Sequence, residues 1–407
     1  MFPPFIEFFA YGRGHGISTS VASFQGLQIN LGQLNAITIA EDGKSARFQG
    51  GLDNGQVLGN VWDQGYVTTT GTATCVGLLG AGLGGGHGVY EGQYGLVIDN
   101  LIHVNIVLAN GTAIGVNETS YPDLWWGIRG AGHNFGIVTS ADMKIYPREI
   151  ETWHYKNYWW AGEKLEEVLE ALNTFHTSDN GTTPPLMGFE AGQFTMNTSV
   201  SETEATLFWS FAYAGTGEEA EKLLEPFNAI ENLGVRSGDT GLPSLSNDMS
   251  AFGEGAACAP IWFVGASTLI GQYNITAMRQ VYDLYNSKAA EYPELGASSQ
   301  IYIEGYATKG MEVVPADTTA FIQFSLAEGS ELHDTAEAWA KQTWDLWVEG
   351  EGPGAQPAHY VNYVLWNPWE TRESIYGPEP WRLERLNQLK GQYDPENRFR
   401  FYVPILE

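Results

Sequence analysis

The pattern of apolar and polar positions changes about a third of the way along the chain. The first third, to about residue 147, holds short alternating runs typical of half-buried strands, such as Leu27–Leu31 and Ala36–Glu41. Glycine-rich turns separate these runs. Leu101–Leu108 followed by Asn110 and Gly111 predicts a β-hairpin with a type I′ turn. These features indicate a strand-rich first domain.

The middle of the chain combines longer strands with amphipathic helices. Leu165–Phe175 carries apolar residues at helical spacing, and Ala277–Tyr292 and Asp334–Val348 are also expected to be helices. The expected strands are Ala205–Ala212, Trp262–Leu269 and Thr319–Ser325. Because strands and helices do not alternate tightly, the pattern predicts an α+β domain on an antiparallel sheet.

A dense cluster of chain breakers, Gly350–Gly354, predicts a second boundary. After it we expect a strand at Tyr360–Leu365 and a helix at Pro380–Lys390 that Gly391 ends. The chain therefore divides into three segments, 1–147, 148–354 and 355–407.

Composition limits the possible functions. A chain of 407 residues is long enough for two or three domains, and 43% hydrophobic content with 14 Trp indicates a folded globule. Twenty basic against 48 acidic residues give a net charge of −28, which argues against nucleic acid as a partner. No apolar run reaches the roughly 18 residues of a membrane span, so no membrane partner is expected.

Cysteine content and sequons bear on the compartment. Cys75 and Cys258 do not define a disulfide framework, and Cys75 is expected to be a small buried hydrophobe. The first residues lack the features of a signal peptide. Five sequons suit a secreted glycoprotein, and their asparagines are Asn110, Asn117, Asn180, Asn197 and Asn274. We expect passage through the secretory pathway, with a cytoplasmic location as the open alternative.

The segment Gly71–Gly88 is a short apolar run followed by a backbone almost without side chains. Five glycines lie between Gly82 and Gly88. Glycine permits positive φ and close approach of the main chain to a flat or anionic ligand. Successive N–H groups in such a loop can form an anion-binding nest. The segment therefore predicts a cofactor-binding loop.

Part of this segment also fits a dinucleotide fingerprint, since Gly80, Gly82 and Gly85 satisfy G-x-G-x-x-G. That fingerprint requires a helix directly after the glycines. Gly84–Gly88 would open a helix only at about 1 kcal/mol per interior glycine. The pattern alone does not favour a Rossmann site, and no Gly-x-Ser-x-Gly elbow supports a serine hydrolase.

Four ordered motifs resemble the berberine-bridge-enzyme-like branch of the vanillyl-alcohol-oxidase superfamily, especially its fungal FAD-linked members. The motifs are Gly12–Gly16, Gly71–Asn100, Asp123–Thr139 and a C-terminal set of Tyr360–Tyr363, Arg382, Lys390 and Tyr393–Phe399. Their order and spacing agree with the family from Tyr11 to Phe399. Nearly the whole chain therefore resembles this family.

The resemblance implies a two-lobed α+β protein with the FAD-binding PCMH-type fold. Residues 1–147 would form the FAD-binding domain, 148–354 the substrate domain on an antiparallel sheet, and 355–407 the segment that completes the FAD domain. The family normally has a further strand–helix–strand unit before the His15 loop, and this sequence begins without it. We expect either a truncated sequence or weaker FAD binding.

The resemblance also implies roles for individual residues. His15 matches the histidine bonded to the flavin 8α-methyl carbon, while Ala73 stands where some relatives carry a second, cysteine tether, so one covalent link is expected. Tyr363 matches the catalytic base. In a straight strand Tyr360 and Tyr363 would point to opposite faces. The expected cofactor-binding residues are Arg13, Gly14, His15, Gly16, Gly71, Thr72, Val76, Gly77, Gly82, Gly84, Gly85, Gly86, His87, Gly88, Gly127, Gly132, Asn134, Phe135, Gly136, Ile137 and Asn397.

The function that the resemblance implies is an FAD-linked oxidase. It would move a hydride from a small hydroxylated or amine-bearing metabolite to the flavin, with O₂ as acceptor, in secondary metabolism, as a monomer or weak homodimer. A carbohydrate oxidase and a non-catalytic secreted glycoprotein of the same fold are the alternatives. No metal is expected, because no His, Cys and Asp spacing forms a metal site and His87 and His133 are expected to be loop histidines.

Overall fold

The computed structural model describes residues 6–22, 24–249, 258, 262–311, 318–327 and 329–406. The chain forms two compact units. Unit 1 comprises Met1–Tyr90, Tyr94–Glu149 and Tyr360–Glu407, and unit 2 comprises Glu91–Gln93 and Ile150–His359. The boundaries expected at 147 and 354 lie close to these limits, and the functional names given to the segments stay predictions.

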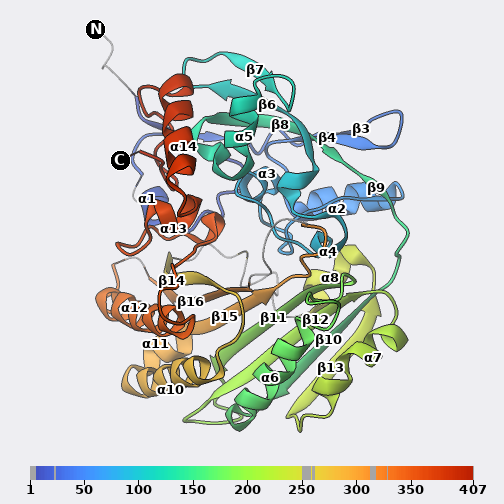
Figure 1. Cartoon of the computed structure of the whole chain (residues 1–407), viewed down its shortest axis with the longest axis vertical. Coiled ribbons are helices and arrows are strands. Elements are labelled where there is room, and N and C mark those ends of the chain that lie inside the picture. The colour runs from blue at the N-terminus through green and yellow to red at the C-terminus, as the bar shows by residue number, and fades with distance from the viewer. Residues whose placement is uncertain are drawn as a thin grey trace. The chain divides into compact units, whose positions relative to one another are not determined.

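Unit 1 is built on a five-stranded sheet in which all neighbouring strands are antiparallel (Figure 1). The order is β3 (Ile37–Ile39), β4 (Ser45–Gln49), β8 (Gly136–Lys144), β6 (Leu101–Leu108) and β7 (Ala113–Val116). Alternate residues such as Val104 and Ile106 of β6 are fully buried, as expected for a sheet with one face on the core.

Three helices also contribute to this core, α2 (Asn54–Asp63), α5 (Pro122–Ala131) and α14 (Pro380–Tyr393), together with shorter segments that include Leu78, Leu79 and Val97. Strand β1 (Phe8–Tyr11) pairs in parallel with β2 (Leu27–Asn30), and β5 (Tyr66–Val67) pairs with β9 (Tyr146–Pro147). The short helices of unit 1 are α1 (Thr19–Ala22), α3 (Leu78–Gly82) and α13 (Arg372–Tyr376), whereas the first three residues of α4 (Glu91–Tyr94) belong to unit 2.

The β6–β7 hairpin is confirmed, but its turn is not type I′. A type I′ turn needs positive φ at both central residues. Gly111 has φ +82°, whereas Asn110 is not among the residues with positive φ. The Gly111 N–H donates to the Leu108 carbonyl at 2.9 Å, and the Leu108 N–H to the Thr112 carbonyl at 2.9 Å. The connection is therefore a longer loop with one left-handed glycine.

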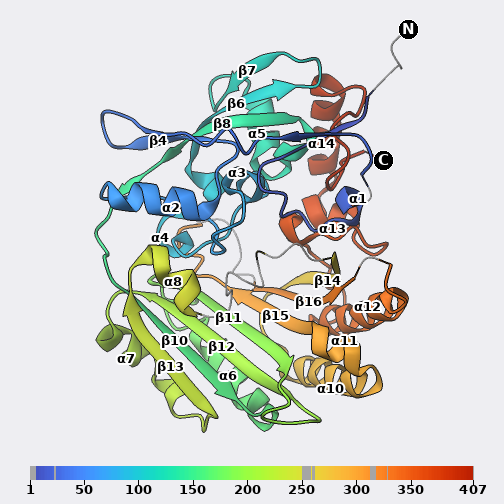
Figure 2. The ribbon, with the colours of Figure 1, turned by 180° about the vertical axis from the view of Figure 1, so that it is seen from behind.

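Unit 2 is built on a seven-stranded antiparallel sheet, so the predicted α+β class and antiparallel sheet are confirmed. Figure 2 shows its strands side by side. The order is β13 (Gly234–Thr240), β10 (Trp153–Trp160), β12 (Ala205–Ala214), β11 (Met187–Met196), β15 (Ser299–Gly305), β16 (Thr318–Leu326) and β14 (Trp262–Ile270).

The helices of unit 2 are α6 (Leu165–Phe175), α7 (Gly217–Asn228), α8 (Leu242–Met249), α10 (Ile275–Glu291), α11 (Pro293–Ser298) and α12 (His333–Gly350). Three ring contacts hold α6, α10 and α12 to one face of the sheet: Phe175–Phe211, Tyr282–Phe194 and Trp339–Phe324. No helix among the described residues is long and apolar enough to cross a membrane.

Two local expectations were wrong. Helix α14 was expected to end at Gly391, but it continues through this exposed glycine to Tyr393. Glycine can adopt a helical φ as well as a positive one, so it does not by itself end a helix. Both Cys75 and Cys258 are disulfide-bonded, and Cys75 is half-buried, so it is not a small buried hydrophobe. Sequence spacing alone does not show which cysteines form disulfides.

A buried ion pair holds the end of α14. Lys390 and Asp394 are both fully buried. The Lys390 ammonium donates to Asp394 Oδ2 at 2.7 Å and to the carbonyls of Asn134 and Phe399 at 2.8 Å, so all three of its donors are used. Asp394 also accepts the N–H groups of Arg398 and Phe399 at 2.8 Å. Burial lowers the pKa of Lys390, and the Asp394 carboxylate opposes this shift.

A second buried carboxyl group shapes the chain before α13. Glu370 is 5% exposed and accepts the N–H of Asn367 at 2.5 Å and that of Leu365 at 3.4 Å. Trp366, between them, has a left-handed φ of +70°. Burial raises the pKa of Glu370 to about 7, although the backbone N–H groups act in the opposite direction.

We expect Lys390→Met to destabilise the protein by about 3–5 kcal/mol, because it leaves the Asp394 carboxylate buried without its cation. The control is Lys44→Met, which removes a solvent-exposed ammonium from the same unit. Urea unfolding of both variants measures the difference. Equal stability of the two variants would contradict this account of the ion pair.

The Glu370 carboxyl predicts a pH dependence of stability. Its folded pKa of about 7 lies above the ordinary glutamate value of 4.5, so the folded state binds the proton more tightly. The stabilising contribution is complete below pH 4.5 and is lost as pH rises through 7, on the order of 3 kcal/mol in total. The unfolding free energy of the wild type should therefore fall relative to that of Glu370→Gln, whose amide does not titrate, as pH rises from 5 to 8. Glu384→Gln, at an exposed position of α14, should leave the pH profile unchanged.

Candidate functional site

The Gly12–Gly16 turn presents His15 at the surface of unit 1. Gly14 has φ +73°, and His15 is exposed beside it. Arg13 forms an ion pair with Asp53. Asp53 in turn caps α2, since its Oδ1 accepts the Gln56 N–H at 2.8 Å. The Arg13 guanidinium therefore already has a carboxylate partner.

The Gly71–Gly77 segment lies along the start of α2. The N–H of Asn54 donates to the Val76 carbonyl at 3.0 Å, and Asn54 Nδ2 donates to the Ala73 carbonyl at 2.9 Å. A Cβ on Gly71 would lie 2.6 Å from Asn54 Nδ2, and one on Gly77 would lie 3.5 Å from Arg13 Cγ. The first two motifs thus adjoin each other, with half-buried Thr72 in the same segment.

Gly84–Gly88 is not helical, as predicted, because Gly85 and Gly86 have φ of +124° and +86°. Its glycines also allow the chain to approach itself. A Cβ on Gly84 would lie 2.3 Å from Asn362 Oδ1, and one on Gly88 would lie 1.7 Å from the Thr70 carbonyl oxygen. At Gly84 and Gly88 another part of the protein lies too close to leave room for a Cβ. Packing within the protein therefore requires glycine at these two positions, whether or not a ligand binds there.

The segment around Tyr363 is not a strand, so that expectation is wrong. Val361–Tyr363 forms a 3₁₀ turn, η4, in which the Tyr363 N–H donates to the Tyr360 carbonyl at 2.8 Å. Residues three apart lie on the same side of such a turn. The rings of Tyr360 and Tyr363 therefore meet edge to face, with centroids 5.2 Å apart, and do not point to opposite faces.

The Tyr360 hydroxyl holds this turn against the glycine loop. It accepts the N–H of Gly86 at 3.0 Å and that of His87 at 3.4 Å. Asn362 Nδ2 donates to the same hydroxyl at 2.6 Å and to the Ala81 carbonyl at 2.8 Å. The His87 ring packs on Tyr360, with centroids 4.6 Å apart. Half-buried Tyr363 thus packs on Tyr360, and Tyr360 in turn binds the predicted cofactor loop.

The loop after α5 adjoins the same glycines. Gly130, with φ +121°, donates its N–H to the Leu83 carbonyl at 3.1 Å. A Cβ on Gly132 would lie 2.8 Å from Leu83 Cδ2. Three other expected residues have structural roles here: Gly127 packs on Leu389, Gly136 lies against the Val107 carbonyl, and Ile137 pairs with Val107 in the sheet.

Asn134 is fully buried, and its side chain binds the C-terminal segment. Its Nδ2 donates to the Val403 carbonyl at 3.2 Å and to the Tyr376 hydroxyl at 3.1 Å, and its Oδ1 accepts the Ile405 N–H at 3.1 Å. Phe135 is a fully buried core residue. Burial lowers the pKa of neighbouring His133 to about 4, so its imidazole is neutral at pH 7. The side-chain amide of Asn134 is thus engaged with the C-terminal segment.

Among the described residues of unit 1, three buried oxygen atoms lack a hydrogen-bond partner: Asn54 Oδ1, Thr69 Oγ1 and Asn397 Oδ1. Two of them flank the Gly71 segment, and Asn397, with a left-handed φ of +49°, lies in the C-terminal motif. Unpaired buried acceptors are costly. A cofactor with several hydroxyl donors, such as FAD, fits these atoms.

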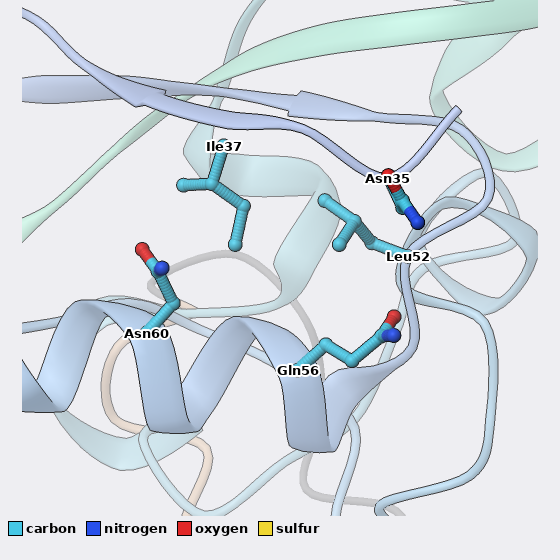
Figure 3. Close-up of a pocket in the computed structure, with 5 residues that line it drawn as sticks. All are labelled: Asn35, Ile37, Leu52, Gln56 and Asn60. Atoms are coloured by element: carbon cyan, nitrogen blue, oxygen red, sulfur yellow. The ribbon is translucent and has the colours of Figure 1, made fainter. Parts of the chain in front are cut away.

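Two other features lie apart from this site. A solvent-open pocket between α2 and β3 is lined by Asn35, Ile37, Leu52, Gln56 and Asn60, none of which is an expected site residue (Figure 3). His333, Asp334 and Glu337 of α12 place possible metal-ligand atoms within 4.8 Å of one another. Asp334 is fully exposed, and exposed acidic side chains commonly cluster without a metal.

Sequence reasoning missed three contributors to this site: Asp53, the Tyr360 hydroxyl and Asn362. Asp53 had a signal, because Asp53 and Gln56 have the spacing of a capping box. The roles of Tyr360 and Asn362 had none, since both depend on a loop more than 270 residues earlier in the chain. The binding and catalytic roles of the expected residues stay predictions.

Comparison with known proteins gives the family. Residues 6–117 match the model of the FAD binding domain. The chain is 52% identical over 411 residues to the FAD-linked oxidoreductase iacH of Pestalotiopsis fici, covering 98% of this chain and 79% of that protein. At 20% identity it shares the fold of a chitooligosaccharide oxidase, with a TM-score of 0.80 and coverage of 97% and 85%. It also shares the fold of Physcomitrella patens BBE-like 1, again at 20% identity and TM-score 0.80, with coverage of 99% and 87%. The chain therefore belongs to the family of FAD-linked oxidoreductases that includes iacH and is an FAD-dependent oxidoreductase.

Proposed function

We propose that this FAD-dependent oxidoreductase is an oxidase in which Tyr363 accepts the proton of a substrate hydroxyl or amine. One observation carries the proposal: the ring of Tyr363 packs on Tyr360, whose hydroxyl is bonded to the Gly86 and His87 N–H groups. A phenol is mostly protonated at pH 7. Only the phenolate form can accept a proton, so the Tyr363 proton would first leave to solvent. The phenolate would then take the substrate proton as the substrate C–H bond breaks, within hydrogen-bond reach of the substrate.

The flavin, when bound, supplies the hydride-accepting centre and passes the electrons on to O₂. The chain supplies binding and orientation. His15, exposed beside left-handed Gly14, is the proposed single covalent tether. Because Arg13 is already paired with Asp53, backbone N–H groups of the glycine loops would carry most of the contact to the diphosphate.

The proposed substrate is a small hydroxylated or amine-bearing metabolite of secondary metabolism. The similarity to iacH over nearly the whole chain supports FAD-linked redox chemistry, and the substrate class is what the resemblance of the sequence motifs implies. A carbohydrate oxidase is the rival, motivated by the fold shared with a chitooligosaccharide oxidase, but at 20% identity that likeness bears on the fold alone. A screen for peroxide release with alcohols, amines and chitooligosaccharides separates the two.

We further propose that the protein matures in the secretory pathway and acts as a monomer or weak homodimer. Two observations support this location: both cysteines are disulfide-bonded, and several sequons lie in exposed loops. Structural disulfides are rare in the reducing cytosol. Oxidised cysteines in the purified native protein would support the proposal, and two free thiols would contradict it.

Tyr363→Phe should lower kcat about 10²- to 10⁴-fold, because it removes the proton acceptor while keeping the ring. Flavin content should not change. The measurement is bleaching of the flavin absorption band with the best substrate from the peroxide screen. Tyr121→Phe, at a 45% exposed position of the same unit, is the matched control. Unchanged turnover in Tyr363→Phe would exclude Tyr363 as the base.

His15→Ala should abolish covalent flavin. After acid precipitation the wild-type pellet should stay yellow and its intact mass should include the flavin, whereas the His15→Ala protein should release all of it. His333→Ala, which removes a half-exposed imidazole from unit 2, should behave as the wild type does. A colourless wild-type pellet would disprove the tether without disproving FAD binding.

A further inference from the structure

The five sequon asparagines differ in how their side chains are used by the fold. N-linked glycosylation takes place at the side-chain Nδ2, and the glycan must leave toward solvent. An asparagine whose Nδ2 is needed inside the protein is therefore a poor acceptor. This difference does not appear in the sequence, where all five sequons are equivalent.

Asn110 and Asn197 present an Nδ2 that no described residue binds. Asn110 is exposed at the tip of the β6–β7 hairpin, where Gly111 and Thr112 are exposed too. Its Oδ1 accepts the Thr112 N–H at 2.9 Å, which fixes the side chain and leaves Nδ2 toward solvent. Asn197 is exposed in the loop between β11 and β12, and its Oδ1 accepts the Ser199 N–H at 3.1 Å in the same way.

Asn117 and Asn274 use both ends of their amides. Asn117 is half-buried, with Nδ2 3.3 Å from His103 Nδ1 and Oδ1 accepting the N–H groups of Thr119 and Ser120. Asn274 caps α10: its Oδ1 accepts the Ala277 N–H at 3.1 Å, and its Nδ2 donates to the Gly350 carbonyl at 2.8 Å. A glycan on either Nδ2 would crowd the partner that this atom now faces.

The side chain of Asn180 is intermediate between the solvent-facing amides of Asn110 and Asn197 and the bound amides of Asn117 and Asn274. It is exposed and has a left-handed φ of +53°, but its Nδ2 donates to Asp179 Oδ1 at the long distance of 3.4 Å.

We propose that Asn110 and Asn197 are the glycosylated sites of this protein and that Asn117 and Asn274 are not. The proposal rests on the proposed passage through the secretory pathway. The donor is an oligosaccharide on a lipid pyrophosphate. Its anomeric carbon leaves the pyrophosphate and bonds to Nδ2, which loses one proton, and the lipid pyrophosphate is the leaving group. No electrons are exchanged.

A further consequence concerns the edge of the unit 1 sheet. Strand β7 is an edge strand, and Asn110 lies at the tip of the hairpin that leads into it. Exposed edge strands invite pairing with other chains. A glycan on Asn110 would hinder such pairing at one end of this edge.

The test uses the full chain secreted from a eukaryotic host. Peptide mass spectrometry after enzymatic deglycosylation in heavy-oxygen water gives the occupancy of each sequon. We expect most Asn110 and Asn197 peptides, and few Asn117 and Asn274 peptides, to be marked. The single variants Asn110→Gln and Asn197→Gln should each lose one glycan from the intact mass. Asn117→Gln and Asn274→Gln should keep the wild-type glycan mass but unfold at a lower temperature, because they lose internal hydrogen bonds.

Two variants of Thr112 test whether a change in the occupancy of Asn110 comes from loss of the sequon and not from altered folding. Thr112→Ala removes the sequon hydroxyl and should abolish occupancy of Asn110, whereas Thr112→Ser should retain it. Occupancy of Asn117 and Asn274 above that of Asn110 and Asn197 would overturn the proposal. An unglycosylated chain would overturn it too, and titration of the cysteines then shows whether the location also fails: two free thiols contradict the secretory pathway, whereas none leaves that location standing.

Discussion

The buried ion pair of Lys390 with Asp394 is the interaction on which unit 1 depends. It joins three parts of the chain, because the ammonium also binds the carbonyls of Asn134 and Phe399. Removing two charges from water is expensive unless every donor and acceptor is satisfied. Here they are satisfied by backbone groups of the segment after α14. The Lys390 and Asp394 positions of the C-terminal motif thus have a role in folding.

The candidate site is assembled on this frame by backbone contacts between distant loops. Asn134, adjacent to the ion pair, binds Val403 and Ile405, while Leu83 of the glycine segment accepts the Gly130 N–H. Tyr360 completes the connection from the other side of the loop. Precise placement of a cofactor requires such support around its contact residues. Glycines such as Gly84 and Gly88 therefore serve the fit between loops as much as any contact with flavin.

The sequence predicted features that depend on local periodicity. Helix Leu165–Phe175 has the predicted limits, because its apolar residues recur at helical spacing and its first turn is acidic. Features that depend on distant contacts were not predictable. The turn at Val361–Tyr363 looks like a strand by its β-favouring residues, but the Tyr360 hydroxyl binds Gly86 and His87. The family motifs identified the candidate site residues. The hydrogen bonds of Asn362 to the Ala81 carbonyl and the Tyr360 hydroxyl could be found only in the structure.

The division of unit 1 along the chain has a consequence for biosynthesis. Its core requires Leu386 and Leu389 from α14, whereas unit 2 is contiguous from Ile150 to His359 apart from three residues. Domains generally fold as units as the chain leaves the ribosome. Unit 2 can therefore form its native sheet while translation continues. The N-terminal part of unit 1 cannot complete its core until Tyr360–Glu407 has been synthesised, so its apolar surface stays uncovered until then. Chaperone demand should be concentrated in that interval.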